Sequence, residues 1–318
     1  MSLDNTPFRA RLERLLLLAG TLLPSPLRIA LLRALGHRVG KRVRIAMLTV
    51  LCAEKITIDD EVRIGPLNII RSGSEVTLGY SSEISFMVII HGRGAFRLGE
   101  RSYVSVQTFI DLAGGVTIGS YSGTGPRTMI FSHAIYLPPS QGYPRVVREI
   151  RIGNYAWLGG MNFLTAGAVV KDHVMTAPGA VISGHVGPDV FWISKDTQIP
   201  LHRICRRMDR NTLTALAHEI LSDFAKTQGL RCVVDGPRCV IGGHAAVLIG
   251  DGTLPDTRDA IAVLLEDAPA PPHRPWYNLV TLRCGTECTG SFHRKLQEHM
   301  RKYFGLHFLP ADRHEVRR

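Results

Sequence analysis

The chain has 318 residues, of which 45% are hydrophobic and 20% are charged, a composition typical of a folded globular protein rather than a disordered one. This length is enough for one large domain and one small domain. The formal net charge of +11 at pH 7 favours acidic partners such as phosphates and nucleotides. Because the sequence contains no RNP-type aromatic motif, zinc-finger spacing or dense Lys/Arg block, nucleic acid is not expected as a partner.

Residues 1–37 predict an N-terminal helical segment. Residues 8–23 place basic residues before an apolar run, as a signal peptide does, but further charges lie against the run and no cleavage site follows it. We expect one amphipathic helix to about residue 23 and a second helix with Ser25 as its N-cap and Gly36 as its terminator. These helices either cap a core or rest on a membrane face. We expect the protein in the cytoplasm.

An internal repeat follows, and it is the strongest feature of the sequence. Apolar residues stand six apart in triplets, and the triplets recur about every twenty residues. The residues in these positions are Val39, Ile45, Leu51; Ile58, Ile64, Ile70; Leu78, Ile84, Ile90; Leu98, Val104, Ile110; Ile118, Thr124, Ile130; Ile152, Leu158, Leu164; and Val170, Thr176, Ile182. The first member of four successive triplets is followed by Asp59, Gly79, Gly99 or Gly119, which predicts a corner.

A six-residue spacing fits a short strand of about four residues plus a tight corner. Three such units close a triangular coil, in which each apolar residue points inward and each strand pairs in parallel with the strand one coil away. The sequence therefore predicts a mainly β protein, with a parallel β-helix of about seven coils over residues 38–198.

The repeat is interrupted between Ile130 and Ile152, where the chain has about fourteen residues more than its period requires. The surplus predicts a loop over residues 136–150, rich in turn-forming residues. Long excursions from a regular scaffold are often functional. His133 lies directly before this loop, and a histidine whose ordinary pKa is near 6.5 is suited to act as a base at neutral pH.

Residues 199–318 predict a separate small α+β domain of unknown role. We expect an amphipathic helix over 211–228 ended by Gly229, strands near 231–234 and 245–249, a helix over 256–266, a strand over 277–283, and a helix over 291–303 with Ser291 as its N-cap. Five of the six cysteines lie beyond residue 200, and free thiols are the main expectation for them. A zinc site or disulfides formed by Cys232, Cys239, Cys284 and Cys288 are the alternatives.

Over about residues 25–195 the repeat resembles that of the hexapeptide-repeat acyltransferases, whose pattern is [Leu/Ile/Val]-Gly-x-x-[small]-x. The resemblance implies a coil that winds left-handed, a homotrimer, acetyl-coenzyme A as the acyl donor, and a sugar hydroxyl of a glycan, polysaccharide or glycolipid as the acceptor. In the maltose, galactoside and virginiamycin acetyltransferases of this family, a histidine five residues after the aliphatic position acts as general base. Here His133 comes three residues after Ile130, and Ser132-His133 is similar to the Thr-His version in polysaccharide-modifying relatives.

The resemblance also implies sites for both substrates. The segment over residues 150–160 is similar to the family's Ile-Gly-x-x-x-Trp-Ile-Gly-[Ala/Ser]. Further along the chain the sequence departs from the family, since Gly184 stands where relatives have a lysine. The residues it assigns to coenzyme A are Trp157, Gly160, Pro178, Ser183 and Lys195, and those it assigns to the sugar are Ser105, Asp111 and Ser132.

Two other functions stay open at this point. One is N-acetylation of an amino sugar on the same scaffold, and the other is a non-catalytic scaffold whose C-terminal domain binds a partner. The γ-class carbonic anhydrases share this scaffold and bind zinc through three histidines, but their histidine spacing is absent here, so no metal is expected.

Overall fold

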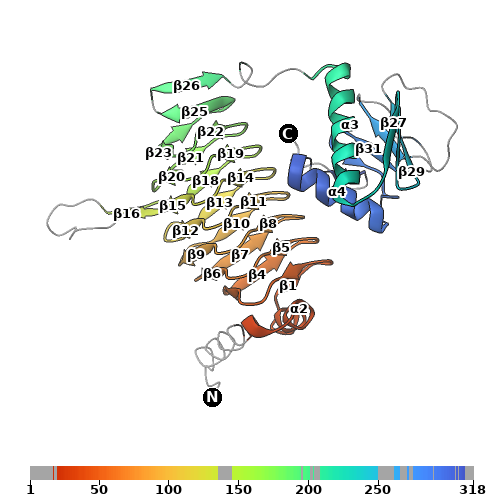
Figure 1. The fold of residues 1–318 in the computed structure, drawn as a ribbon. Coiled ribbons are helices and arrows are strands. Elements are labelled where there is room, and N and C mark those ends of the chain that lie inside the picture. Colours follow the sequence, from red (N-terminus) through yellow and green to blue (C-terminus); the bar gives the residue numbers. More distant parts are fainter. Residues whose placement is uncertain are drawn as a thin grey trace. The chain divides into compact units, whose positions relative to one another are not determined.

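The structure is a computed structural model that describes residues 17, 20–134, 145–194, 196–200, 203, 208–249, 261–265, 271, 275–288, 290–304, 306 and 308–311. Lys195 and most of the predicted loop lie outside these residues. The chain divides into two compact units, Met1–Cys205 and Arg206–Arg318 (Figure 1).

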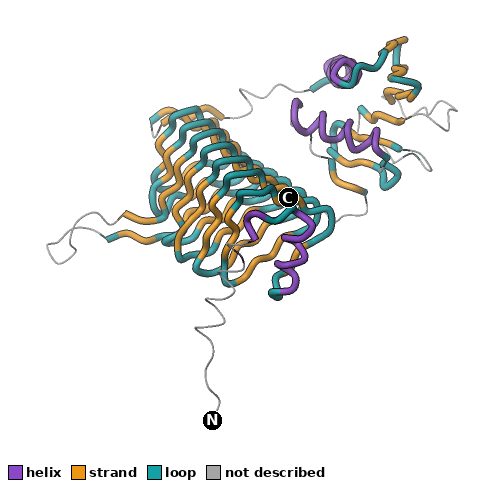
Figure 2. Tube along the Cα trace, turned by 60° about the horizontal axis from the view of Figure 1, so that its bottom comes forward, coloured by secondary structure: helices purple, strands orange, loops and turns teal. Residues whose placement is uncertain are grey.

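The first unit is a parallel β-solenoid of about seven coils, and each coil gives one strand to each of three sheets (Figures 1 and 2). The first sheet contains β1 (Arg38–Val39), β4 (Lys55–Ile58), β7 (Glu75–Leu78), β10 (Phe96–Leu98), β13 (Val116–Ile118), β18 (Ile150–Ile152), β21 (Val169–Val170) and β24 (His185–Val186). The second contains β2 (Arg44–Ile45), β5 (Arg63–Ile64), β8 (Glu83–Ile84), β11 (Tyr103–Val104), β14 (Gly123–Thr124), β19 (Trp157–Leu158), β22 (Met175–Thr176), β25 (Val190–Ser194) and β26 (Thr197–Pro200). The third contains β3 (Val50–Cys52), β6 (Ile69–Ser72), β9 (Ile89–Gly92), β12 (Phe109–Asp111), β15 (Met129–Phe131), β20 (Phe163–Leu164) and β23 (Val181–Ile182).

The repeat positions of the sequence fill the core of this solenoid. Every residue of the predicted triplets is buried, including the two threonines. Successive members pair across the coils, so that Ile110 lies opposite Ile90 on one side and Ile130 on the other. The predicted parallel β-helix is therefore confirmed.

The corners between the first and second sheets depend on two different backbone requirements. Glycine is needed at Gly99 because an added Cβ would lie 2.5 Å from the backbone of Gly119 in the next coil. Two residues further on, Arg101 and Tyr121 have φ of 54° and 56°, in the left-handed region that glycine usually occupies. Close approach between coils, rather than the sign of φ, thus explains the glycines of the repeat.

The N-terminal helix α2 (Ser25–Ala34) packs on the first coil. The predicted N-cap is wrong, since the helix already includes Ser25 and its N-cap Pro24 makes no side-chain cap bond. Instead Ser25 Oγ accepts a hydrogen bond from the backbone of Ile45 at 3.0 Å, because the open end of the solenoid leaves that amide without a preceding coil. Gly36 ends the helix as predicted, with φ of 89°. The 3₁₀ helix η1 (Gly20–Leu22) precedes α2, and most of the first predicted helix lies outside the described residues.

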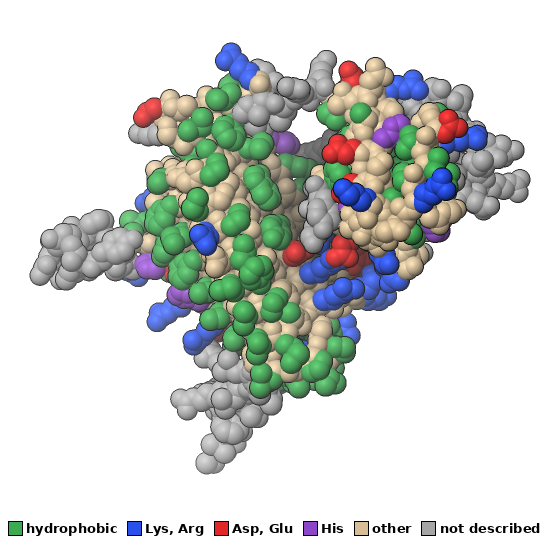
Figure 3. Space-filling view, in the orientation of Figure 1, with side chains coloured by type: hydrophobic (Ala, Val, Ile, Leu, Met, Phe, Trp, Pro, Cys, Tyr) green, Lys and Arg blue, Asp and Glu red, His purple; other side chains and the backbone are tan. Residues whose placement is uncertain are grey.

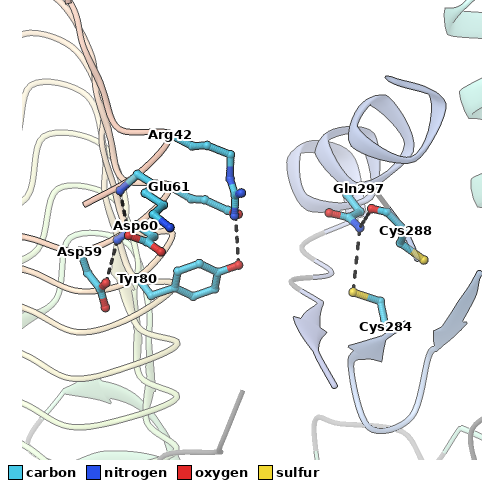
Figure 4. A network of polar contacts seen from close by, with 9 residues as sticks. Arg42, Asp59, Asp60, Glu61, Tyr80, Cys284, Cys288 and Gln297 are labelled. Atoms are coloured by element: carbon cyan, nitrogen blue, oxygen red, sulfur yellow. Dashed lines mark hydrogen bonds and ion pairs between the residues drawn. The ribbon is translucent and has the colours of Figure 1, made fainter. Parts of the chain in front are cut away.

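Arg28 satisfies further backbone groups at the same end. Its guanidinium donates to the carbonyl oxygens of Ala46 and Thr49, and it is buried, which lowers its pKa to about 10. At the nearby corner Arg42 pairs with Glu61, whose other carboxylate oxygen accepts from Tyr80 Oη at 3.1 Å (Figure 4). Together, these contacts of α2 and of the corner stabilise the first coil of the solenoid.

The second unit is an α+β fold with one mixed sheet. Its elements are α3 (Arg210–Thr227), β27 (Cys232–Asp235), β28 (Arg238–Ile241), β29 (His244–Ile249), β30 (Ile261–Leu264), β31 (Trp276–Asn278), β32 (Arg283–Cys284), α4 (Ser291–Phe304) and β33 (Leu309–Pro310). Both long helices and the strands β27 and β29 were predicted, whereas β28, β32 and β33 were not. The strand predicted over 277–283 is correct only in part, since β31 ends at Asn278 and a turn follows.

The helix predicted over 256–266 is wrong where the structure describes it. Ile261–Leu264 form β30, which pairs in parallel with β29 and β31 in the middle of the sheet. All four residues are buried, so the run shows no alternation of polar and apolar residues that would distinguish a strand from a helix. Across both units, no described helix is long and apolar enough to cross a membrane.

Candidate active site

The candidate site lies where the chain leaves the third sheet. After β15 the chain forms a short antiparallel hairpin in which β16 (His133–Ala134) pairs with β17 (Val146–Val147), and His133 lies opposite Val147. The backbone of Arg148 also donates to Ser132 O at 3.0 Å. Figure 1 shows this hairpin projecting from the side of the solenoid. The strand pairing fixes His133 at the base of the projection, against the coil.

The ring of His133 contacts the carboxylate of Asp111, from the coil before. Its Nδ1 atom lies 2.7 Å from Asp111 Oδ2. The His133 side chain is 33% exposed, while the Asp111 side chain is only 6% exposed. The pair thus has a buried acid and an imidazole that solvent or a ligand can reach.

Short backbone and hydroxyl contacts hold the Asp111 carboxylate in place. Ser132 Oγ lies 3.0 Å from Asp111 Oδ2 and 2.9 Å from Asp111 O, so its single hydroxyl proton serves one of them at a time. The backbone of Ala113 donates to Oδ2 at 3.2 Å, and the backbone of Gly114 donates to Ser132 Oγ at 2.8 Å. All of these contacts lie at the corner between the third and first sheets, in two adjacent coils.

This arrangement determines which ring nitrogen can act as a base. An ionised carboxylate only accepts hydrogen bonds, so the Nδ1 atom of a neutral His133 carries the hydrogen that points to Asp111. Its Nε2 atom then carries the lone pair of the ring. Asp111 would also stabilise the positive charge that appears on the ring when Nε2 takes up a proton.

The structure therefore brings together three of the predicted residues, His133, Asp111 and Ser132. The contact between Asp111 and His133 was not foreseen, because Asp111 was predicted as a sugar ligand. The repeat indicates only that the two residues lie on adjacent coils, since Asp111 pairs with Phe131 and His133 lies just beyond that partner. The sugar-binding role of Asp111 and Ser132 stays a prediction.

Ser105 lies elsewhere, on the buried turn that leads into β12, at the opposite end of that strand from Asp111. Its backbone donates to Thr124 Oγ1 at 3.1 Å, so the described contacts of Ser105 are internal to the solenoid. Its role as a sugar ligand also stays a prediction.

Three residues predicted to bind the cofactor lie together on another edge of the solenoid. Trp157 is on β19 and is 45% exposed, and its ring lies so close over Gly123 that an added Cβ there would be 2.9 Å from it. Gly160 and Pro178 occupy the turns between the second and third sheets in adjacent coils. Those turns are joined by a hydrogen bond from Gly179 N to Gly160 O at 2.8 Å.

The remaining predicted cofactor residues are less closely grouped. Ser183 is exposed and follows β23, the last strand of the third sheet, and Lys195 lies outside the described residues. The first set, around Trp157, occupies the edge between the second and third sheets, whereas His133 occupies the edge between the third and first sheets. One copy of the chain thus keeps these two groups a full strand apart.

Within the part of the chain that the structure describes, no three His, Cys, Asp or Glu side chains are grouped so that they could hold a metal ion. The described cysteines are free thiols, and the sulfur atoms of Cys232 and Cys239 lie 3.2 Å apart.

Comparison with known proteins gives matches only among solved structures. No family model matches the sequence, and no curated protein matches it. A hexapeptide-repeat acetyltransferase from Vibrio cholerae, complexed with acetyl-coenzyme A, is 17% identical with a TM-score of 0.30, covering 63% of this chain and 92% of that one. A maltose O-acetyltransferase from Clostridium difficile is 13% identical with a TM-score of 0.31, covering 62% and 86%.

A third similar structure is a variant of an N-acyltransferase from Bacillus cereus, in complex with dTDP-4-amino-4,6-dideoxyglucose and coenzyme A. It is 17% identical with a TM-score of 0.36, covering 60% of this chain and 94% of that one. With TM-scores of this size, the fold of this chain rests on its own repeat and strand pairing. All three matched structures are acyltransferases.

Proposed function

We propose that this chain is an acyltransferase that moves an acetyl group from acetyl-coenzyme A to a sugar hydroxyl, with His133 as general base. The observation that carries the proposal is the contact between the half-buried ring of His133 and the buried carboxylate of Asp111, 2.7 Å apart. A histidine oriented by a carboxylate is the usual arrangement for moving a proton at neutral pH.

In the proposed reaction the acceptor hydroxyl gives its proton to His133 Nε2 as its oxygen attacks the thioester carbonyl carbon. The resulting tetrahedral intermediate collapses by breaking the carbon–sulfur bond. The imidazolium returns its proton to the departing thiolate, so the products are the acetyl ester and free coenzyme A. No covalent intermediate on the protein is needed, and Asp111 stabilises the imidazolium while it exists.

For the donor, we propose that the pantetheine arm lies beside Trp157 and the turns at Gly160 and Pro178. The exposed indole on a flat strand and the two stacked turns offer an apolar surface with backbone groups at its edge, which suits such an arm. Ser183, Lys195 and the net charge of +11 support binding of the phosphates.

We also propose a homotrimer, because the donor site and His133 lie on different edges of one copy. A neighbouring copy that packs against the third sheet would bring its own donor edge toward His133. The outer face of that sheet carries exposed apolar side chains at Met129 and Val181. Figure 3 shows hydrophobic side chains spread over much of the solenoid face in view.

N-acylation of an amino sugar is the second candidate, since the same base would deprotonate an attacking amine. The Bacillus cereus N-acyltransferase, with its amino-sugar nucleotide, is the observation that favours it. The two acceptor types give different products, because hydroxylamine at alkaline pH cleaves an ester and leaves an amide intact.

The test is an assay of coenzyme A release with acetyl-coenzyme A and paired sugar and amino-sugar acceptors, with mass spectrometry of the products. We expect His133→Ala to lower the rate about 10²–10⁴-fold, the usual contribution of a positioned base. His185→Ala, at an exposed histidine on β24, is the matched control and should keep the wild-type rate. Equal, measurable rates for wild type and His133→Ala would leave His133 without a chemical role, whereas no measurable transfer by either protein would favour a non-catalytic scaffold.

A further inference from the structure

A cleft of about 650 Å³ lies on the outer face of the third sheet, next to the candidate site. Its walls come from β3, β6 and β9, the three coils before Asp111. Two exposed aliphatic side chains, Ile69 and Ile89, line it together with Arg71, His91 and Arg93. This volume is in the range of sites that hold a small molecule.

The charge of the cleft is positive. No acidic residue lines it, and for Arg71 and Arg93 no carboxylate partner is found among the described residues. Elsewhere in the solenoid, Arg42, Arg97 and Arg151 each pair with a glutamate, which neutralises their charge. Figure 3 shows Lys or Arg and His side chains gathered along the edge of the solenoid beside the hairpin.

The register of the third sheet connects this cleft to the base. Arg71 pairs with His91, and His91 pairs with Asp111, so the three residues form one column across three coils. Adjacent strands are about 4.8 Å apart, which puts the Arg71 backbone about 10 Å from that of Asp111. A molecule about the size of a sugar phosphate would therefore span the distance from the arginines to His133.

We propose that the acceptor is an anionic sugar, and that its phosphate-class group binds in this cleft between Arg71 and Arg93. This inference rests on the proposed function, because it defines the acceptor of that reaction. Guanidinium groups bind phosphate oxygens through paired, charge-assisted hydrogen bonds. Ile69 and Ile89 would contact the apolar face of the sugar ring, and the hydroxyl beyond it would face His133.

The phosphates of coenzyme A are the other source of the same chemistry. The proposed donor site favours the acceptor as the source, because Trp157 and Gly160 lie on the other edge of the solenoid. The experiment therefore includes both sources.

The test measures binding by calorimetry, without turnover. The probes are glucose 6-phosphate against glucose, and coenzyme A against 3′-dephospho-coenzyme A. The proteins are the full chain, Arg71→Gln, Arg93→Gln and the double variant, with Arg38→Gln, an exposed arginine on the first sheet, as the matched control. We expect the full chain to bind glucose 6-phosphate at least about 10-fold more tightly than glucose, which is about 1.4 kcal/mol.

The double variant should lose this preference, while the control keeps it and the ratio for the two forms of coenzyme A does not change. Equal affinity of the full chain for both sugars, or an unchanged preference in the double variant, would overturn the proposal. A loss confined to coenzyme A would assign the cleft to the donor and overturn it as well. If the chain binds the sugar phosphate in this way but transfers no acetyl group, the proposed function fails and the anion site stands.

Discussion

The two units of this chain build their cores in different ways. In the solenoid, buried aliphatic residues stack in layers from coil to coil, and polar side chains inside it form hydrogen bonds between coils, as where Asn162 accepts from Thr176 and donates to Ala177 O. The core of the second unit instead includes Tyr277, Cys284 and Cys288. Gln297 Nε2 lies 3.9 Å from Cys284 Sγ and 3.4 Å from Cys288 O (Figure 4).

In the solenoid, the residues of the candidate site lie outside the hydrophobic core. In the second unit, side chains that can titrate are part of the core. The solenoid places its site, His133 and Asp111, on the outer side of its strands, where a change leaves the stacked layers intact. The hydrophobic core of the second unit itself contains the thiols of Cys284 and Cys288 and the hydroxyl of Tyr277, so its stability depends on their protonation. Three substitutions test this contrast.

The largest effect on stability is expected from a core position of the solenoid. Ile84→Ala removes a fully buried side chain from the stack and should lower the free energy of unfolding by about 2–5 kcal/mol. Ile89→Ala, at a side chain that is 37% exposed on an outer face, is the control and should cost clearly less. Denaturant titration measures both, and equal losses would contradict the layered core.

A smaller effect is expected from Asp111→Asn, and it should fall on activity. The amide keeps a hydrogen-bond partner for His133 but removes the charge that stabilises the imidazolium. We expect acetyl transfer to slow by about 10², with the melting temperature little changed because the residue lies outside the stacked layers. A large loss of stability with little loss of rate would instead make Asp111 a structural residue. Asp59→Asn, on a corner of another coil, is the control.

The smallest effect, taken per pH unit, concerns the stability of the second unit. Hydrogen bonding with Cys284 is the main reason why the pKa of the Cys288 thiol falls from 9.0 to about 5, although burial opposes it. Between those values the unfolded chain binds more protons, so the folded unit should gain stability as the pH rises, by at most about 1.4 kcal/mol per pH unit. This contribution is complete above pH 9.0 and is lost as the pH falls through about 5.

Hydrogen exchange of the α4 and β31 amides, corrected for intrinsic rates, measures this dependence. Cys288→Ala should flatten it, whereas Cys52→Ala in the solenoid should leave it unchanged. A slope of the opposite sign in the unsubstituted chain would contradict the assignment.

The same difference explains how much of the fold could be predicted from the sequence. In the solenoid each inward residue recurs at a fixed spacing, so positions such as Ile110 and Ile130 identify the same place in successive coils. In the second unit the buried strand Ile261–Leu264 has no periodicity, and its parallel pairing with β29 and β31 depends on segments far apart in the chain. Local patterns could not supply that pairing.

The candidate site was only partly predictable for a related reason. His133 could be found because the loop breaks the repeat beside it. Its contact with Asp111 depends on how far the chain leaves the coil before the hairpin begins, which the backbone pairing of His133 with Val147 determines. Neither residue type nor spacing indicated that pairing.

The hairpin has one further consequence. Across it, β13 and β18 pair as if no residues intervened, with Val116 opposite Ile150 and Ile118 opposite Ile152. The pairing of the coils on either side therefore does not depend on how many residues the loop between them contains. A longer, shorter or transplanted loop should leave the solenoid folded, which makes this point in the chain suited to the insertion of a new segment.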